Sequence, residues 1–132
     1  MRLVAYTDNV GFSIPKLRSG RESFSPDAAF YDGPLPPNRM RFIEGPPTFA
    51  VEVRSEEDYG PVAERRMADK RADYFAAGTL VVWDVDVLRD QCVRVYRATD
   101  PEPPTVYRRG ETAEAEPGVP EWTFPVDDLF LE

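Results

Sequence analysis

The sequence contains no histidine and, among its 132 residues, only one cysteine, Cys92. A zinc site built from imidazole and thiolate ligands is therefore excluded, as are an intramolecular disulfide and every nucleophile that depends on a histidine base. The side chains left for chemistry are carboxylates, lysines and arginines. They suit hard cations bound through oxygen, such as Mg²⁺ or Mn²⁺.

Long apolar runs are also missing, since no stretch approaches the roughly 20 apolar residues needed to cross a bilayer. The first ten residues are too polar for the hydrophobic region of a signal peptide. We therefore expect no membrane partner and a cytoplasmic location. Positive charge is scarce too, because 24 acidic and 16 basic residues give a net charge of −8. An enzyme acting on nucleic acid would thus need a local basic patch or a partner.

The length predicts one domain over residues 1–132. Apolar, β-prone segments predict short strands that form a meander, and a proline-rich loop from Asp32 to Thr48 separates them from a further strand. These strands are expected at 3–6, 11–14, 27–31 and 49–55.

A helix is predicted from Pro61 to Ala77, because proline suits a first helical turn and Gly78 suits the position after the last one. A hairpin (79–86 and 92–98), a weak strand (105–109) and a final helical turn follow. Strands around a single long helix indicate an α/β or α+β fold, in which one main helix packs on a mixed sheet.

Two of these elements, the strand at 49–55 and the helix, have charged side chains on a face that is predicted to point inward. In the segment FAVEVRS, side chains alternate, so Glu52 and Arg54 share one face of the strand. Because an unpaired buried carboxylate is costly, Glu52 requires a cation, a metal or open solvent beside it. At 100° per residue, Lys70 falls within the apolar stripe of the helix, toward that strand. Alternatively, Lys70 lies at the edge of the stripe and its ammonium extends into water.

A second acid, Asp27, begins the strand in the segment SPDAAFY. Two acidic side chains on adjacent strands can share one divalent cation, while a nearby lysine stabilises negative charge on a phosphate. Without a metal, Asp27 is a turn residue and Glu52 forms an ion pair with Arg54 or Lys70. Asp84 and Asp86 share a face of a later strand, and we expect surface or turn roles for both.

Several segments together resemble the PD-(D/E)XK nuclease superfamily and, within it, the Uma-type putative restriction endonuclease family. They are SPDAAFY, GPPTFAVEVRS, KRADYFAAGTLVVWDVD, VRVYR and GETAEAEPGVPEWTFPVDDLF, and they run from about Gly11 to the C-terminus. The resemblance implies a restriction-endonuclease-like mixed sheet. It also implies an endonuclease that uses Mg²⁺ or Mn²⁺ and has DNA as its substrate.

Carried over residue by residue, the resemblance implies that Asp27 and Glu52 are metal ligands and, together with Lys70, catalytic residues. The general motif places its lysine two residues after the second acid, where this chain has Arg54. In Uma-type proteins the lysine is commonly moved to the following helix in a KxxxY pattern, which corresponds to Lys70 and Tyr74. Arg54 then either pairs with Glu52 or binds a phosphate.

The chain also departs from the family pattern at its beginning, because we expect its first strand at 3–6, without the helical segment that usually precedes it. One sheet face would then be uncovered, so we expect a homodimer. Two alternatives to the endonuclease stay open. One is a catalytically inactive, nuclease-like binding or assembly module, and the other is an enzyme that hydrolyses a smaller phosphate ester.

Overall fold

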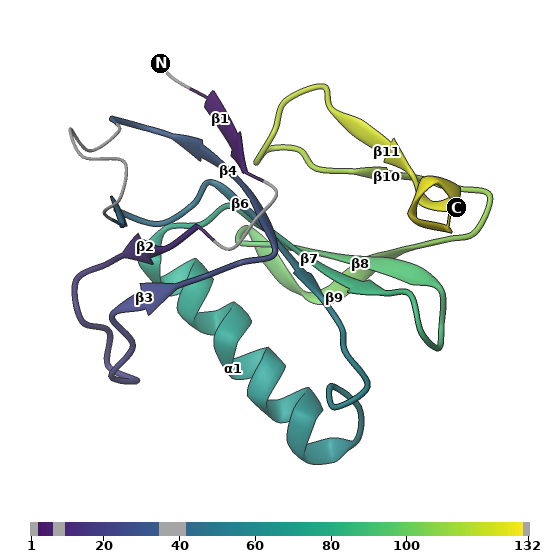
Figure 1. The fold of residues 1–132 in the computed structure, drawn as a ribbon, viewed down its shortest axis with the longest axis horizontal. Coiled ribbons are helices and arrows are strands. Elements are labelled where there is room, and N and C mark those ends of the chain that lie inside the picture. Colours follow the sequence, from purple (N-terminus) through teal and green to yellow (C-terminus); the bar gives the residue numbers. More distant parts are fainter. Residues whose placement is uncertain (1–2, 7–9, 35–41, 131–132) are drawn as a thin grey trace.

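The computed structural model describes residues 3–6, 10–34 and 42–130. Its centre is a six-stranded sheet in the order β1-β4-β6-β7-β8-β9 (Figure 1). Strands β6 and β7 are parallel and every other neighbouring pair is antiparallel, so the sheet is mixed. These strands are β1 (Leu3–Tyr6), β4 (Ala28–Asp32), β6 (Phe49–Val53), β7 (Val81–Asp86), β8 (Cys92–Arg97) and β9 (Asp100–Arg108).

Helix α1 (Pro61–Ala77) joins the parallel strands β6 and β7, and its bounds are the predicted ones. Gly78 ends the helix with φ 117°, a left-handed conformation in which its N–H donates to the carbonyls of Tyr74 and Phe75. No helix in the described part of the chain is long and apolar enough to span a membrane. The α+β fold with one main helix on a mixed sheet is therefore as predicted.

Two smaller sheets complete the architecture. Strands β2 (Phe12–Ser13), β3 (Ser23–Phe24) and β5 (Ile43–Glu44) form one, and β10 (Thr112–Glu114) pairs with β11 (Thr123–Pro125) in the other. The 3₁₀ helix η1 (Val126–Phe130) supplies the expected final helical turn. The predicted meander is wrong, because β4 pairs with β1 while β2 and β3 leave the main sheet. Part of the proline-rich loop, 35–41, lies outside the described residues.

The main sheet has a different cover on each face (Figure 1). On one face, Ala50 and Val82 pack with Tyr74 of α1 and with Phe12 and Phe24 of the small sheet. On the other face, Phe49, Trp83 and their neighbours pack against β10, β11 and η1. Because residues alternate between these two cores, Glu52 and Arg54 lie on the helix side of β6. The functional site is therefore expected between β6 and α1.

Candidate active site

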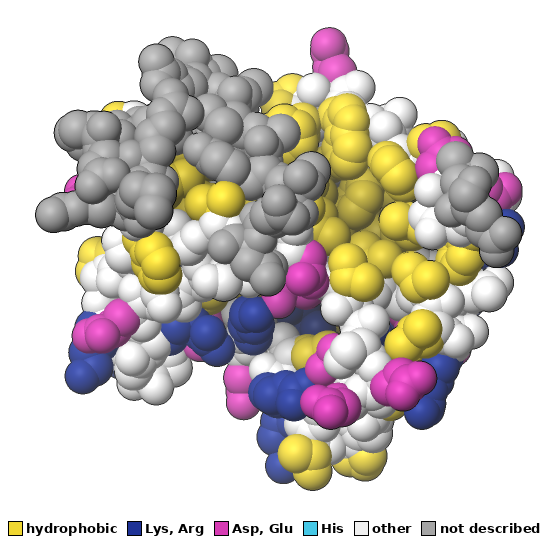
Figure 2. Space-filling model, in the orientation of Figure 1, with side chains coloured by type: hydrophobic (Ala, Val, Ile, Leu, Met, Phe, Trp, Pro, Cys, Tyr) yellow, Lys and Arg dark blue, Asp and Glu magenta, His cyan; other side chains and the backbone are white. Residues whose placement is uncertain are grey.

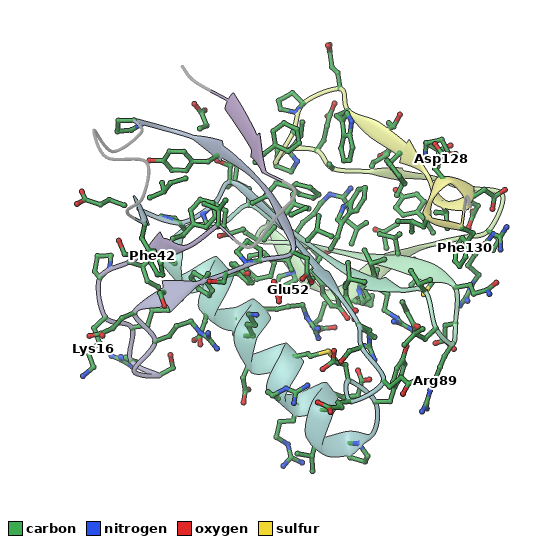
Figure 3. All side chains as sticks on the ribbon, in the orientation of Figure 1. Lys16, Phe42, Glu52, Arg89, Asp128 and Phe130 are labelled. Carbon is green, nitrogen blue, oxygen red and sulfur yellow. The ribbon has the colours of Figure 1, made fainter. Side chains whose placement is uncertain are left out.

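Glu52 lies between the sheet and α1, in contact with two side chains of the helix (Figure 3). The Lys70 ammonium is 2.5 Å from Glu52 Oε1, and the Tyr74 hydroxyl donates to Glu52 Oε2 at 3.0 Å. Lys70 and Tyr74 are one helical turn apart, so both reach the same carboxylate. Lys70 therefore turns toward the strand rather than toward open water.

Asp27 is fixed to the same strand by backbone contacts. Its Oδ2 accepts the N–H of Val53 at 2.7 Å, and its own N–H donates to the carbonyl of Val51 at 3.0 Å. Asp27 is thus hydrogen-bonded to the two residues on either side of Glu52. Its charge is close enough to raise the pKa of Glu52. The structure brings Asp27, Glu52 and Lys70 to one end of β6.

Glu52 and Lys70 open into a cavity of about 300 Å³, which is also lined by Arg21, Met67 and Tyr74. The two ion-paired side chains keep 28% and 29% of their surface exposed, so solvent and ligands can reach them. A hollow bordered by basic and acidic side chains is visible at this place in Figure 2. The cavity is therefore lined by charged side chains that a ligand from solvent can reach.

Burial dominates the electrostatics of Glu52. It raises the pKa of this carboxyl above its usual range, and the charge of Asp27 adds to the effect, although Lys70 and Tyr74 act in the opposite direction. Burial likewise raises the pKa of Tyr74, and the neighbouring Glu52 charge raises it further. Tyr74 consequently stays a phenol and a hydrogen-bond donor to Glu52.

Arg54 is held in a closed network two residues along the same strand. Its Nε and Nη2 donate to the two oxygens of Asp84 at 2.9 and 2.8 Å, and Nη1 and Nη2 donate to Glu64 at 2.5 and 2.9 Å. Nη1 also donates to the carbonyl of Asp58. All five N–H donors of the guanidinium are thus engaged. Arg54 has no donor left for a phosphate, and it does not contact Glu52 through any of these bonds.

The expected surface role of Asp84 and Asp86 is wrong, because their exposed fractions are 4% and 1%, but Asp86 does have a turn role, since it accepts the backbone N–H of Arg89 at 3.0 Å. Asp84 binds Arg54, and Asp86 accepts a hydrogen bond from the Tyr59 hydroxyl at 2.5 Å. Hydrogen bonds from Tyr59 and from backbone amides lower the pKa of Asp86 despite its burial, which acts to raise it. Their common face on the buried strand VVWDVD was the available signal, but it did not identify their partners.

The donor set fits a hexacoordinate oxygen-bound cation only in part. Among the described residues, no group of three or more Cys, Asp or Glu side chains is arranged to hold a metal ion. Mg²⁺, however, usually keeps several waters and binds proteins through one or two carboxylates plus substrate phosphate. Asp27 and Glu52 supply two carboxylates at one end of β6, but only Glu52 is among the residues that line the cavity. An ionised carboxylate has about four acceptor sites, so Glu52 can bind an ion in addition to its present partners.

Comparisons with known proteins identify the family through a sequence model and the fold through a solved structure. The sequence model of the Uma2 family, described as "Putative restriction endonuclease", matches residues 1–127. A crystal structure of a putative nuclease belonging to DUF820 from Anabaena variabilis ATCC 29413 is similar with a TM-score of 0.69 and 19% identity. The match covers 97% of this chain and 68% of that one. No match was found among curated proteins.

Proposed function

The chain belongs to the Uma2 family of putative restriction endonucleases, and we propose that it is a metal-dependent endonuclease that hydrolyses phosphodiester bonds in DNA. The proposal treats residues 1–132 as one nuclease domain. The observation that carries it is the meeting of Glu52, Lys70 and Tyr74 in an open cavity, with Asp27 hydrogen-bonded to the same strand.

In this proposal Asp27 and Glu52 hold Mg²⁺ or Mn²⁺. When bound, such an ion would polarise the phosphate and lower the pKa of a coordinated water. Tyr74 fixes one oxygen of Glu52 through its hydrogen bond, and the other oxygen is the one that contacts Lys70. The Lys70 side chain stabilises negative charge that develops on the phosphate oxygens. The Glu52–Lys70 contact therefore has to open when substrate enters.

Cleavage assays with purified protein test this assignment. Linear duplex DNA is incubated with Mg²⁺, with Mn²⁺ or with excess EDTA, and the variants Asp27→Ala and Glu52→Gln are compared with Asp69→Asn. Asp69 is an exposed acid on α1, the helix that carries Lys70, and it controls for the change in charge. We expect metal-dependent cleavage by the wild type and by Asp69→Asn, and none by the other two. Cleavage that survives Asp27→Ala would rule out the proposed metal site.

Calorimetric titration with Mn²⁺ tests binding separately from chemistry. Because the pKa of Glu52 is raised, a proton competes with the metal at a higher pH than for an ordinary carboxylate. Affinity for Mn²⁺ should therefore fall as the pH is lowered from 7 to 5, and Glu52→Gln should remove most of this pH dependence. Equal affinity at both pH values would contradict a role for Glu52 as ligand.

A catalytically inactive binding or assembly module is the second candidate. It is favoured by the ion pair that already engages Glu52 and by Arg54 standing where the general motif has its lysine. Absence of Mn²⁺ binding at millimolar concentration, together with retained DNA binding, would select this alternative. A nucleotide phosphate ester tested beside the duplex distinguishes a small-substrate hydrolase from both.

We further propose that the protein acts as a homodimer, because cutting both strands of a duplex is most direct with two sites. Figure 2 shows a broad hydrophobic area between the β1–β4 side of the sheet and the β10–β11 hairpin. Phe30, Val51 and Trp122 are only partly buried on this sheet face. Sedimentation equilibrium should give twice the chain mass, and Phe30→Glu should shift it to the monomer. A monomeric wild type at micromolar concentration would contradict the dimer.

A further inference from the structure

The overall charge of the chain creates a problem for the proposed function. A net charge of −8 repels DNA, so a nuclease of this composition needs positive charge concentrated near its site. The hairpin formed by β2, β3 and their connection, residues 12–24, offers such a concentration. It carries Lys16, Arg18 and Arg21 against the single acid Glu22.

Backbone hydrogen bonds make this hairpin a defined element. The N–H of Ile14 donates to the carbonyl of Glu22 at 2.9 Å, and the N–H of Leu17 donates to the carbonyl of Arg21 at 3.0 Å. Gly20 occupies the turn with φ 96°, a conformation that favours glycine. The basic side chains therefore project from a folded hairpin with a fixed register.

Two contacts tie the hairpin to the active site. The Phe24 ring stacks on Tyr74 with centroids 4.0 Å apart and an interplanar angle of 13°, and Tyr74 in turn donates to Glu52. Arg21 Nε donates to Asp73 of α1 at 2.8 Å. Both contacts reach neighbouring residues on the helix that carries Lys70. The position of the hairpin is therefore coupled to the position of the site.

Arg21 lines the same cavity as Glu52 and Lys70. Its Nε donates to Asp73 and its guanidinium lies 5.3 Å from the centroid of the Phe24 ring, but its two terminal Nη groups make no hydrogen bond within the described part of the chain. Lys16 and Arg18 are exposed, and neither pairs with an acid among the described residues. Figure 3 shows Lys16 at the outer end of the hairpin, away from the labelled Glu52. Basic side chains thus extend from the cavity outward.

We propose that the β2–β3 hairpin binds the phosphate backbone of duplex DNA beside the cleaved bond. This inference rests on the proposed nuclease function and names the surface by which its substrate is held. Arg21 donates its free Nη groups to a phosphate at the cavity mouth, and Lys16 and Arg18 contact phosphates farther along. Contacts of this kind position a duplex without reading its sequence, because they involve no base edges.

Other arginines near the cavity also have partners within the protein. Arg54 spends all five donors on protein groups, and Arg71 lies over the Tyr96 ring at 4.0 Å. Arg66 forms an ion pair with Asp58. The hairpin differs from them because, beside Arg21, it carries Lys16 and Arg18, two exposed cations that pair with no acid among the described residues.

Binding of a labelled duplex, measured by fluorescence anisotropy at several salt concentrations with EDTA present, tests the proposal without catalysis. The slope of log K against log salt is negative, and each lost phosphate contact reduces its magnitude by about 0.9. Lys16→Ala with Arg18→Ala should therefore reduce the magnitude of the slope by about 2 and the affinity by roughly tenfold at moderate salt. The matched control, Arg108→Ala with Arg109→Ala, removes the same charge at the β9–β10 turn and should bind as the wild type does.

A second pair of variants separates phosphate binding by Arg21 from a structural role. Arg21→Ala removes both the ion pair with Asp73 and the free donors, whereas Asp73→Asn removes only the ion pair. We expect Arg21→Ala to weaken DNA binding severalfold and Asp73→Asn to leave it equal or stronger. Equal weakening in both would show that Arg21 acts only through Asp73 and would overturn its role.

The outcomes also distinguish this inference from the proposed function. If the wild type binds DNA and the hairpin variants keep the wild-type slope, the hairpin assignment fails while the nuclease proposal stands. If the hairpin variants lose binding but no metal supports cleavage, the hairpin assignment stands and the nuclease proposal fails. A wild type that binds an acidic peptide but no duplex would overturn both.

Discussion

Glu52 and Arg54 are two residues apart on the same face of β6, yet their ion pairs differ in kind. Glu52 meets Lys70 through one contact of 2.5 Å, and the two side chains are 28% and 29% exposed. Arg54 and Asp84 share two hydrogen bonds and are 4% and 5% exposed. An open pair can exchange its partner for a ligand, because water and the ligand replace the lost contact. A closed pair cannot, because opening it leaves a buried charge.

The comparison assigns chemistry to one pair and architecture to the other. The Arg54 network joins β6, the loop after it, the first turn of α1 and β7, through Asp58, Glu64 and Asp84. It thereby fixes the start of the helix that carries Lys70. The site is adjustable at Glu52 because its surroundings are fixed at Arg54.

The largest effect is expected from breaking the closed pair. Asp84→Ala removes the buried partner of Arg54, which keeps only the half-exposed Glu64 as an acid, and it also removes an acid that lies within 4.0 Å of Arg71 and Arg94. Loss of one partner of a buried pair costs about 3–5 kcal/mol of stability. Urea denaturation monitored by tryptophan fluorescence measures it, with Asp69→Asn as control. A loss below about 1 kcal/mol would mean that the network is not structural.

Breaking the open pair should instead affect activity. Lys70→Met removes charge stabilisation at the phosphate, and such losses typically lower kcat by about 10²–10³-fold. Its cost in stability should stay under about 1 kcal/mol, because the pair is partly solvated. Cleavage rates and urea midpoints of the same preparation measure both. A strongly destabilised variant with normal kcat would reverse the contrast between the two pairs.

Replacing both partners of the closed pair sharpens the comparison further. Arg54→Met with Asp84→Leu removes both members of the buried pair together, so the double variant should be more stable than Asp84→Leu alone by about 2 kcal/mol or more. A double-mutant cycle from urea denaturation gives this coupling. Additive effects of the two single changes would show that Arg54 and Asp84 contribute independently.

The smallest effect concerns pH and stability at the open pair. Because burial raises the pKa of Glu52 above 4.5, the protonated form favours the folded state. This contribution is fully present below the unfolded pKa and is lost as the pH rises through the folded pKa. Glu52→Gln, which cannot ionise, should therefore gain stability relative to the wild type between pH 4 and 7. A constant difference over this range would contradict the raised pKa.

The sequence was sufficient where local chemistry decides the structure. Proline at position 61 and glycine at 78 set the helix bounds, and the alternation in FAVEVRS placed Glu52 and Arg54 on one face. The absence of histidine limited the chemistry to carboxylates and cations before any contact was known. These properties depend on backbone preferences and side-chain types, which a short segment of sequence is enough to determine.

Tertiary structure decided which of the possible charge pairs form, because the sequence left both Arg54 and Lys70 open as partners of Glu52. Glu52 and Arg54 look equivalent along the strand. In the structure, Glu52 lies opposite Asp84 in the parallel register of β6 and β7. Helix α1 places Lys70 against Glu52 and Glu64 against Arg54. The departure of β2 and β3 from the main sheet, which brings Arg21 to the cavity, was likewise not predicted. Such pairings join residues far apart in the chain, and their energies depend on burial. Burial is a property of the packed molecule and not of any segment within it.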